Sequence, residues 1–170
     1  MNKLLRLLVF ACLALAPIGA SAQMGQFKAL YLYNFAKNIG WPEADNGSEF
    51  VITIVGDNEL TGELEKLAKS RMIGSRKVVV RQAATALAAD KSQIVYLGES
   101  KSAQMSQLVA GQSGNNVLIV GGKPGLCSNG AGISFVPVDG KLKYEISQRN
   151  IKKFGLQVSA KILQLGIEVN

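Results

Sequence analysis

FVITIVGD, residues 50–57, is the stretch of this 170-residue sequence that decides its fold. Residues 50–55 are almost continuously apolar, whereas a strand with one solvated face alternates apolar and polar residues. A run of this kind is typical of a strand buried on both faces of a parallel sheet, and Gly56 permits a tight turn at its end. We therefore expect residues 50–55 to form a central strand of an α/β domain.

Apolar runs of the same kind recur along the chain and alternate with segments of helical spacing. Strands are expected at residues 78–80, 94–97 and 117–120, and helices at residues 26–39, 60–68, 83–89 and 105–109. Strands that alternate with helices in this way indicate right-handed βαβ units. The sequence therefore predicts a Rossmann-like α/β fold, in which a mostly parallel sheet is flanked by helices.

The C-terminal part of the chain has a different pattern. Residues 133–138 and 141–146 are separated by Asp139-Gly140, which is a strong signal for a type I′ β-hairpin. We expect this hairpin to be followed by two short helices. The residues expected to cap or end these helices are Ser147, Gly155 and Ser159.

The segment at residues 26–39 has the spacing of an amphipathic helix. One apolar face consists of Phe27, Leu30, Tyr31, Phe35 and Ile39, and a second consists of Ala29, Leu32, Tyr33 and Ala36. We expect a helix with two apolar faces to be covered by protein on more than one side. Gly40 is expected to end the helix with a left-handed cap, since Pro42 forbids its continuation.

The start of the chain has the features of a cleaved signal peptide. A basic start precedes the apolar run at residues 4–15, and Ala20-Ser21-Ala22 provides a small-residue cleavage site. The apolar run is too short to span a bilayer. Lipid attachment at Cys12 is an alternative, but simple cleavage fits the sequence better. We expect residues 1–22 to be removed and residues 23–170 to form one exported, periplasmic domain.

The composition argues against several classes of function. The sequence contains no histidine, which removes the commonest general base and the commonest zinc ligand. Removal of residues 1–22 takes away two basic residues, so the formal net charge falls from +7 to +5 (7 − 2 = 5). The remaining basic residues are scattered, and neither nucleotide-binding glycine fingerprint is present. We therefore expect no metal, no cofactor, no bound nucleic acid and no catalytic residues.

Cys127 is the single cysteine that remains after the expected cleavage. It has no intrachain partner, so the domain lacks the disulfides on which small secreted folds often depend. A small packed residue is favoured over a redox thiol, because no histidine or basic cluster lies nearby in the sequence. The sequence leaves the role of Cys127 open.

Glycines follow three of the expected strands. In open α/β sheets, ligands bind beyond the carboxyl ends of the strands, at the switch in strand order. The residues expected to line such a crevice are Gly56, Asp57, Gly98, Gly121 and Gly122. The alternative is that these glycines only permit tight turns. Asp57 and Glu99 are the one pair of acids placed for acid–base work, and such a pair often arises by chance.

Several segments of the chain carry recognisable motifs. They are ALYLYNFAKNIGWP at residues 29–42, IVGDNEL at 54–60, GISFV at 132–136, KLKYEI at 141–146 and GLQVSAKIL at 155–163. In this order they resemble the YfiR-like family of periplasmic proteins, and the resemblance spans nearly the whole expected mature chain.

The resemblance implies a Rossmann-like periplasmic domain that is often a homodimer and has no catalytic residues. The best-known members bind the periplasmic sensor region of a membrane-bound diguanylate cyclase and repress it, which lowers cyclic di-GMP and biofilm formation. The chain departs from the family at Ser92, where many members have cysteine, and at Ser147, where asparagine is usual. These departures argue against redox control through disulfides.

We therefore expect a non-catalytic regulatory protein that inhibits a membrane-bound diguanylate cyclase by binding one of its conformations better than another. The expected partner is the periplasmic region of an inner-membrane signalling protein. The alternative is a periplasmic protein that binds a small molecule in the crevice. The residues predicted to contact the partner are Tyr33, Lys37, Trp41, Lys143 and Glu145. For the two aromatic residues the alternative is a place in the core, and for the charged residues a solvated surface.

Overall fold

The computed structural model describes residues 19–42 and 47–170. The predicted signal peptide lies mostly outside these residues, so its cleavage stays a prediction. The strands within the described residues are β1 (Ile39–Gly40), β2 (Glu49–Val55), β3 (Met72–Ile73), β4 (Arg76–Ala83), β5 (Ile94–Leu97), β6 (Leu118–Gly121), β7 (Ile133–Val138), β8 (Lys141–Ile146), β9 (Gln157–Val158) and β10 (Ile167–Glu168).

Most of these strands form one curled sheet. Its order among the described residues is β10-β8-β7-β6-β5-β2-β4-β3, and β1 pairs separately with β9. The contacts between β4, β2, β5, β6 and β7 are all parallel, whereas β8 and β3 pair antiparallel with their chain neighbours. Numbered along the chain, the parallel strands have the order 2-1-3-4-5 of a doubly wound sheet. The predicted Rossmann-like class is therefore confirmed.

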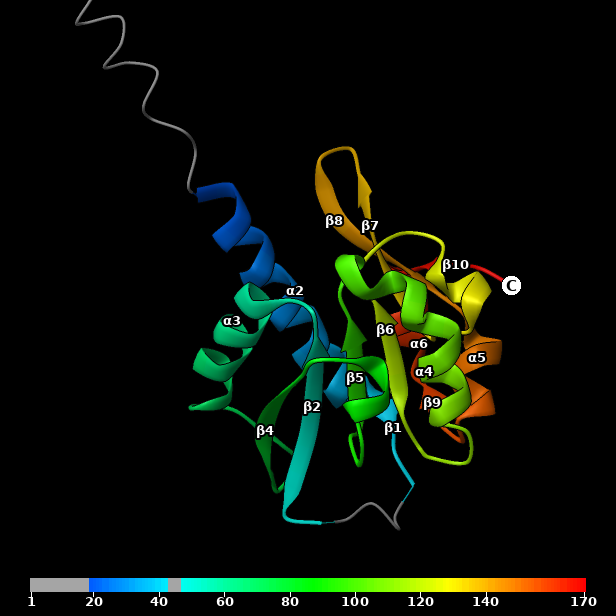
Figure 1. The fold of residues 1–170 in the computed structure, drawn as a ribbon, viewed down its shortest axis with the longest axis horizontal. Helices are drawn as coiled ribbons and strands as arrows, with labels where there is room; N and C mark the ends of the chain where they lie inside the picture. Colours follow the sequence, from blue (N-terminus) through cyan, green and yellow to red (C-terminus); the bar gives the residue numbers. More distant parts are fainter. Residues whose placement is uncertain (1–18, 43–46) are drawn as a thin grey trace, which may run out of the picture.

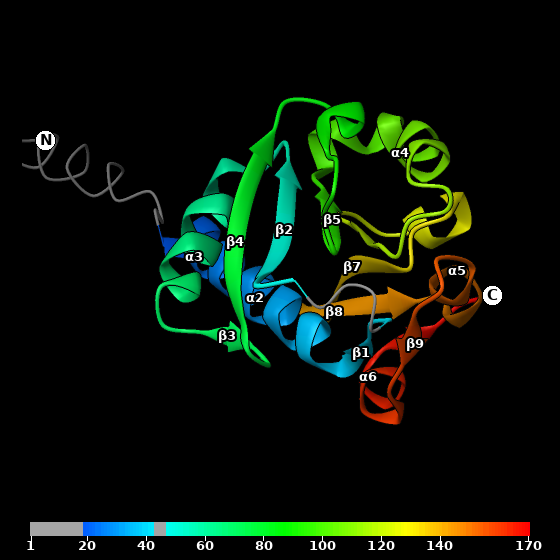
Figure 2. The same cartoon turned by 90° about the horizontal axis from the view of Figure 1, so that it is seen from below.

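The helices lie on both sides of this sheet. They are α2 (Gly19–Asn38), α3 (Asn58–Ala68), α4 (Met105–Gly111), α5 (Gln148–Lys153) and α6 (Ala160–Leu165), with short 3₁₀ helices at η2 (Ala86–Ala88), η3 (Glu99–Gln104) and η4 (Leu126–Asn129). Figures 1 and 2 show α2 and α3 side by side on one face, and α4 on the opposite face. Among the described residues, no helix is long and apolar enough to cross a membrane.

The central strand has the burial that its sequence predicts. Every residue of β2 after Glu49 is buried, as expected for a central strand of a parallel sheet that is covered on both faces. The predicted hairpin is also confirmed, with β7 and β8 in register from Ile133↔Ile146 to Val138↔Lys141. Asp139 and Gly140 both have positive φ angles, 50° and 72°, as a type I′ turn requires.

Two predictions about the opening helix are wrong. Phe27 and Leu30 are 44% and 41% exposed, although Phe35 and Ile39 of the same predicted face are buried. Gly40 does not form a left-handed cap: it continues into β1, where it pairs with Gln157 of β9. Pairing with β9 places Gly40 in an extended conformation, so the left-handed conformation of a helix cap is not adopted.

Some local expectations also need correction. The alanine-rich segment 83–89 forms only the single turn η2, because its first residue belongs to β4. Ser147 caps α5 as predicted, since its side chain accepts a hydrogen bond from the Asn150 amide at 3.4 Å. Ser159 precedes α6 as predicted, but its buried hydroxyl has no hydrogen-bond partner among the described residues.

Helix α2 is fixed to the C-terminal hairpin by an aromatic cluster. Phe35 packs edge-on against Tyr144 of β8 with ring centroids 4.9 Å apart, and Tyr31 packs against the same ring at 5.5 Å. Phe135 of β7 completes the cluster. The Tyr144 hydroxyl donates a hydrogen bond to the Ile162 carbonyl oxygen at 2.7 Å, which holds α6 against the same core. The N-terminal helix therefore packs directly on the C-terminal elements of the sheet.

Two phenylalanines of α2 provide a matched test of this packing. Phe35→Ala empties a fully buried site, and we expect it to lower the free energy of unfolding by about 3–5 kcal/mol. Phe27→Ala removes the same atoms from an exposed site, and we expect a loss below about 1 kcal/mol. Urea unfolding followed by circular dichroism measures both. Equal losses would show that α2 is not placed as described.

Candidate functional site

The switch in strand order lies between β2 and β5. The chain leaves β2 toward β4 on one side, and β5 lies on the other side. Gly56 and Asp57 follow β2, and Gly98 and Glu99 follow β5. A doubly wound domain commonly has its ligand crevice at this point, and the loops that the sequence singles out after these two strands lie here.

Close packing fills much of that crevice. The Gly98 amide donates a hydrogen bond to the Val55 carbonyl oxygen at 2.8 Å, and a Cβ atom at Gly98 would lie 2.5 Å from the Gly56 carbonyl oxygen. A Cβ atom at Gly122 would lie 2.6 Å from the Tyr96 hydroxyl oxygen. These glycines are needed because the strand ends approach too closely for any side chain. The tight-turn alternative therefore accounts for them better than contact with a ligand does.

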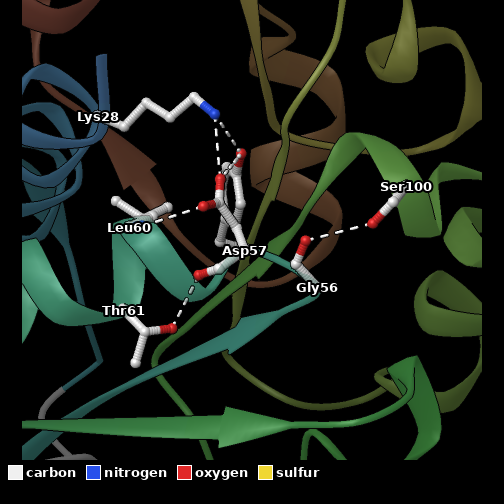
Figure 3. A network of polar contacts seen from close by, with 7 residues as sticks. Lys28, Gly56, Asp57, Leu60, Thr61 and Ser100 are labelled. Carbon is white, nitrogen blue, oxygen red and sulfur yellow. Dashed lines mark hydrogen bonds and ion pairs between the residues drawn. The ribbon is translucent and has the colours of Figure 1, made fainter. Parts of the chain in front are cut away.

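A three-residue polar network lies inside the crevice, as Figure 3 shows. Lys28 of α2 points down toward the strand ends, and its Nζ atom lies 3.1 Å from both the Asp57 Oδ2 atom and the Tyr96 hydroxyl oxygen. The Tyr96 hydroxyl lies 3.1 Å from the same Asp57 oxygen, to which it donates. We call Lys28, Asp57 and Tyr96 the crevice network.

Asp57 also organises the start of α3. Its Oδ1 atom accepts a hydrogen bond from the Leu60 amide at 3.0 Å, as an N-cap side chain does. Its carbonyl oxygen accepts one from the Thr61 hydroxyl at 2.9 Å. Both carboxylate oxygens therefore have partners within the protein. In many doubly wound domains, the helix N-terminus at this position binds the anionic group of a ligand. Here the carboxylate of Asp57 occupies the N-terminus of α3 and supplies the negative charge from within the chain.

Tyr96 is the most deeply buried member of the crevice network. Burial raises the pKa of Tyr96 well above its ordinary value, and the negative charge of Asp57 and its hydrogen bond raise it further. The phenol therefore stays neutral and acts as a donor to Asp57. Glu99, which the sequence pairs with Asp57 as an acid–base candidate, is an exposed residue of η3, whereas both Asp57 oxygens are engaged elsewhere.

A shallow hollow remains beside the crevice network. It has a volume of about 450 Å³ and lies between the ends of β2 and β4. Its lining consists of Gly56, Asn58, Gln82, Ala83, Ala84 and Lys101. Of the five residues predicted to line a ligand crevice, Gly56 is therefore the one that borders this hollow. Whether any of the five contacts a ligand stays a prediction.

An apolar groove lies between the N-terminal half of α2 and the tip of the β7–β8 hairpin, which project in the same direction in Figure 1. Its volume is about 450 Å³. Its lining consists of Gln23, Met24, Phe27, Tyr31, Gly140, Lys141 and Leu142. The Tyr31 hydroxyl donates a hydrogen bond to the Leu142 carbonyl oxygen at 3.1 Å, which fixes the floor of the groove.

Tyr33, Lys37 and Trp41 come from the C-terminal half of α2 and the residues after it. Tyr33 donates a hydrogen bond to the Met72 carbonyl oxygen at 3.1 Å, and the Lys37 Nζ atom lies 5.7 Å from the centre of its ring. The Trp41 ring packs edge-on against Phe50 at 5.1 Å, and its Nε1 atom donates to the Ala36 carbonyl oxygen at 3.0 Å. The contacts of Trp41 are those of a core anchor, and its contact with a partner stays a prediction.

The other two predicted partner residues lie elsewhere. Lys143 and Glu145 belong to β8, next to β10 at the opposite end of the sheet order from β3. Lys143 is exposed, whereas Glu145 accepts a hydrogen bond from the Gly125 amide at 2.8 Å. The structure therefore separates the five residues into two groups.

Cys127 is buried beside Ser134, whose hydroxyl donates a hydrogen bond to its Sγ atom at 3.3 Å. Burial raises the pKa of the Cys127 thiol to about 11. The thiol is thus protonated at neutral pH, which fits the packed-residue interpretation. No group of three potential metal ligands occurs among residues 19–42 and 47–170.

Fold and site together define a doubly wound α/β domain whose crevice contains the protein's own charged groups. Comparison with known families makes the assignment more specific: the profile described as YfiR/HmsC-like matches residues 25–167. The chain therefore belongs to the YfiR/HmsC-like family, whose members are periplasmic and act with membrane signalling proteins. A search of curated proteins finds no match.

The raised pKa of Tyr96 predicts how stability depends on pH. An unfolded tyrosine ionises near pH 10, whereas folded Tyr96 holds its proton to higher pH, so folding stability falls as the pH rises above 10. Removing this group in Tyr96→Phe should reduce that slope by up to about 1.4 kcal/mol per pH unit. Urea unfolding at a series of pH values from about 9 to about 12 provides the measurement, because this range begins below the ordinary tyrosine pKa and extends above it.

Tyr144→Phe serves as the comparison for this experiment. Burial raises the pKa of Tyr144 to about 12, so its contribution ends near that pH, whereas that of Tyr96 continues. A slope that is unchanged in Tyr96→Phe would mean that the phenol ionises freely in the folded protein, contrary to its position in the crevice network.

Proposed function

We propose that this protein is an exported, non-catalytic regulator that binds the periplasmic region of a membrane-bound diguanylate cyclase and inhibits it. The family match over residues 25–167 carries the proposal, because members of this family act with membrane signalling proteins. Inhibition of a cyclase lowers cyclic di-GMP and with it biofilm formation. The inhibitory role and the identity of the enzyme are the new elements of the proposal.

The geometry of the crevice supports a regulator over an enzyme. Catalysis needs acids, bases or nucleophiles that are free to reach a substrate. Asp57 has hydrogen-bond partners at both carboxylate oxygens, and Tyr96 is buried and neutral. The charged groups at the strand ends therefore act on each other, and they hold α2 against the sheet.

A protein of this kind controls an enzyme by binding one of its conformations more tightly than another. To shift a cyclase from about 99% active to about 99% inactive requires a difference in binding free energy of about 5.5 kcal/mol. A few buried contacts in a protein–protein interface supply a difference of this size. No chemical step by the regulator is needed.

The proposal predicts a defined change in cells. Deletion of the gene should raise cellular cyclic di-GMP several-fold, and the full-length protein should restore the original level. A variant without residues 1–22 should be produced but should fail to restore it, because the expected partner surface lies in the periplasm. Cyclic di-GMP is measured by mass spectrometry of cell extracts.

Two results would contradict the proposal. Cyclic di-GMP that is unchanged by deletion would remove the regulatory role. Tight binding of a small metabolite by the purified protein, together with that result, would favour the solute-binding alternative instead. In that case the hollow between the ends of β2 and β4 is the place to look for the ligand.

A further inference from the structure

Strand β4 has a free edge over most of its length. Strand β3 pairs only with Arg76 and Lys77, through Ile73 and Met72. From Val78 to Ala83, no strand lies on that side of β4 in the described part of the chain. Figure 2 shows β3 beside the start of β4 only.

The hydrogen-bonding groups along this edge follow from the register. The Lys77 amide donates to the Ser48 carbonyl oxygen at 3.0 Å, so the backbone groups of residue 77 point toward β2. Because these directions alternate along a strand, the groups of Val78, Val80 and Gln82 point away from β2. In the β3–β4 hairpin, Ile73 and Arg76 form the hydrogen-bonded pair, so the outward amide of Val78 faces the Arg71 carbonyl oxygen. Beyond Val78, no described strand pairs with the outward groups of Val80 and Gln82. We call Val80 and Gln82 the β4 edge.

Basic side chains flank the β4 edge. Lys77 and Arg81 are exposed and lie four residues apart, so they project from the same face of the strand. Neither has an ion-pair partner within the residues that the structure describes. Val79, which lies between them, is half-buried. The edge therefore combines free backbone groups with a short row of basic and apolar side chains.

This surface continues into residues that the sequence already singles out. Met72 in β3 is 53% exposed, and its carbonyl oxygen accepts the hydrogen bond from Tyr33. The Arg71 guanidinium lies 5.8 Å from the centre of the Tyr33 ring, and Lys37 lies over the same ring. Two of the predicted partner residues therefore border the start of the β4 edge.

We propose that the β4 edge binds an extended acidic segment of the partner, which adds to the sheet as a further strand. This inference rests on the proposed function and names the chemistry of its contact. Backbone hydrogen bonds to Val80 and Gln82 hold the segment in register, as in other cases of strand addition. Carboxylates spaced four residues apart on the segment pair with Lys77 and Arg81.

The charges disfavour a second copy of this chain as the occupant. Antiparallel pairing of two β4 edges places Lys77 and Arg81 of one copy beside the same residues of the other, either directly opposite or on the diagonal. Like charges in these positions destabilise a strand pair. Basic residues at a sheet edge thus prevent self-association while they leave the edge open to an acidic strand.

A pair of substitutions at Val80 separates the backbone from the side chain. Val80→Pro removes the outward amide, and proline is tolerated at an edge strand whose amide faces solvent. Val80→Ala keeps the amide and shortens the side chain. For the exported full-length protein, we expect Val80→Pro to weaken binding to the cyclase's periplasmic region about tenfold or more, and Val80→Ala to weaken it less than about threefold. Calorimetric titration measures both, and circular dichroism checks folding.

A charge pair gives a second test that does not depend on proline. Lys77→Gln with Arg81→Gln should weaken binding about tenfold at low salt, and less at high salt. Lys152→Gln with Lys153→Gln changes the net charge equally on α5, outside the β4 edge, and should leave the affinity unchanged. Amide hydrogen exchange should show new protection of Val80 and Gln82 when the cyclase region is bound.

Several results would overturn the inference. The β4 edge is not the contact if the cyclase region binds the Val80→Pro protein as tightly as the original. The same holds if the bound cyclase region slows amide exchange only in the groove between α2 and the hairpin. In both cases the proposed function stands. If Val80→Pro converts a dimer to a monomer in sedimentation, the edge joins two copies of this chain. If the original protein neither binds the cyclase region nor lowers cyclic di-GMP, the proposed function fails and this inference fails with it.

Discussion

The buried hydroxyl of Tyr96 is the constraint on which the arrangement of this domain depends. A phenol inside an apolar core needs a hydrogen-bond partner, and leaving it unsatisfied costs about 1–3 kcal/mol. Asp57 accepts a hydrogen bond from this hydroxyl, and Lys28 donates to the same Asp57 oxygen and offsets the charge of Asp57. Gly122 makes room for the hydroxyl. Four separate segments therefore meet at this one group, and together they fix α2 over the ends of the strands.

The position of α2 then determines which surfaces the protein offers. Its middle is fixed at Lys28 and at Phe35, where the ring packs against Tyr144. Its N-terminal half extends past the sheet and leaves Phe27 exposed beside the hairpin. Its C-terminal half brings Tyr33 to the carbonyl oxygen of Met72, next to the β4 edge. A single helix thus connects the crevice network with both candidate contact surfaces.

The sequence predicts the parts of this fold that local pattern determines. The apolar run at residues 50–55 and the Asp139-Gly140 turn each depend on neighbours in the chain. The crevice network is different, because Lys28 meets Tyr96 across 68 residues and nothing near either residue signals the other. The same limit applies to Phe27 and Phe35, which have equivalent spacing on α2 although one of them lies beyond the sheet. Two-residue strands such as β3 give no periodic signal at all.

The crevice and the edges of the sheet have opposite characters, and this contrast supports a binding role. Where a doubly wound enzyme leaves room for a ligand, this chain places Asp57 and Lys28 against each other. Where a sheet usually protects its edges, β4 leaves the outward groups of Val80 and Gln82 without a strand partner among the described residues, and Lys77 and Arg81 place charge beside them. Charge protects an edge only against strands of like charge. The proposed contact at the β4 edge therefore selects an acidic strand, which is the selectivity that the proposed regulator of one partner requires.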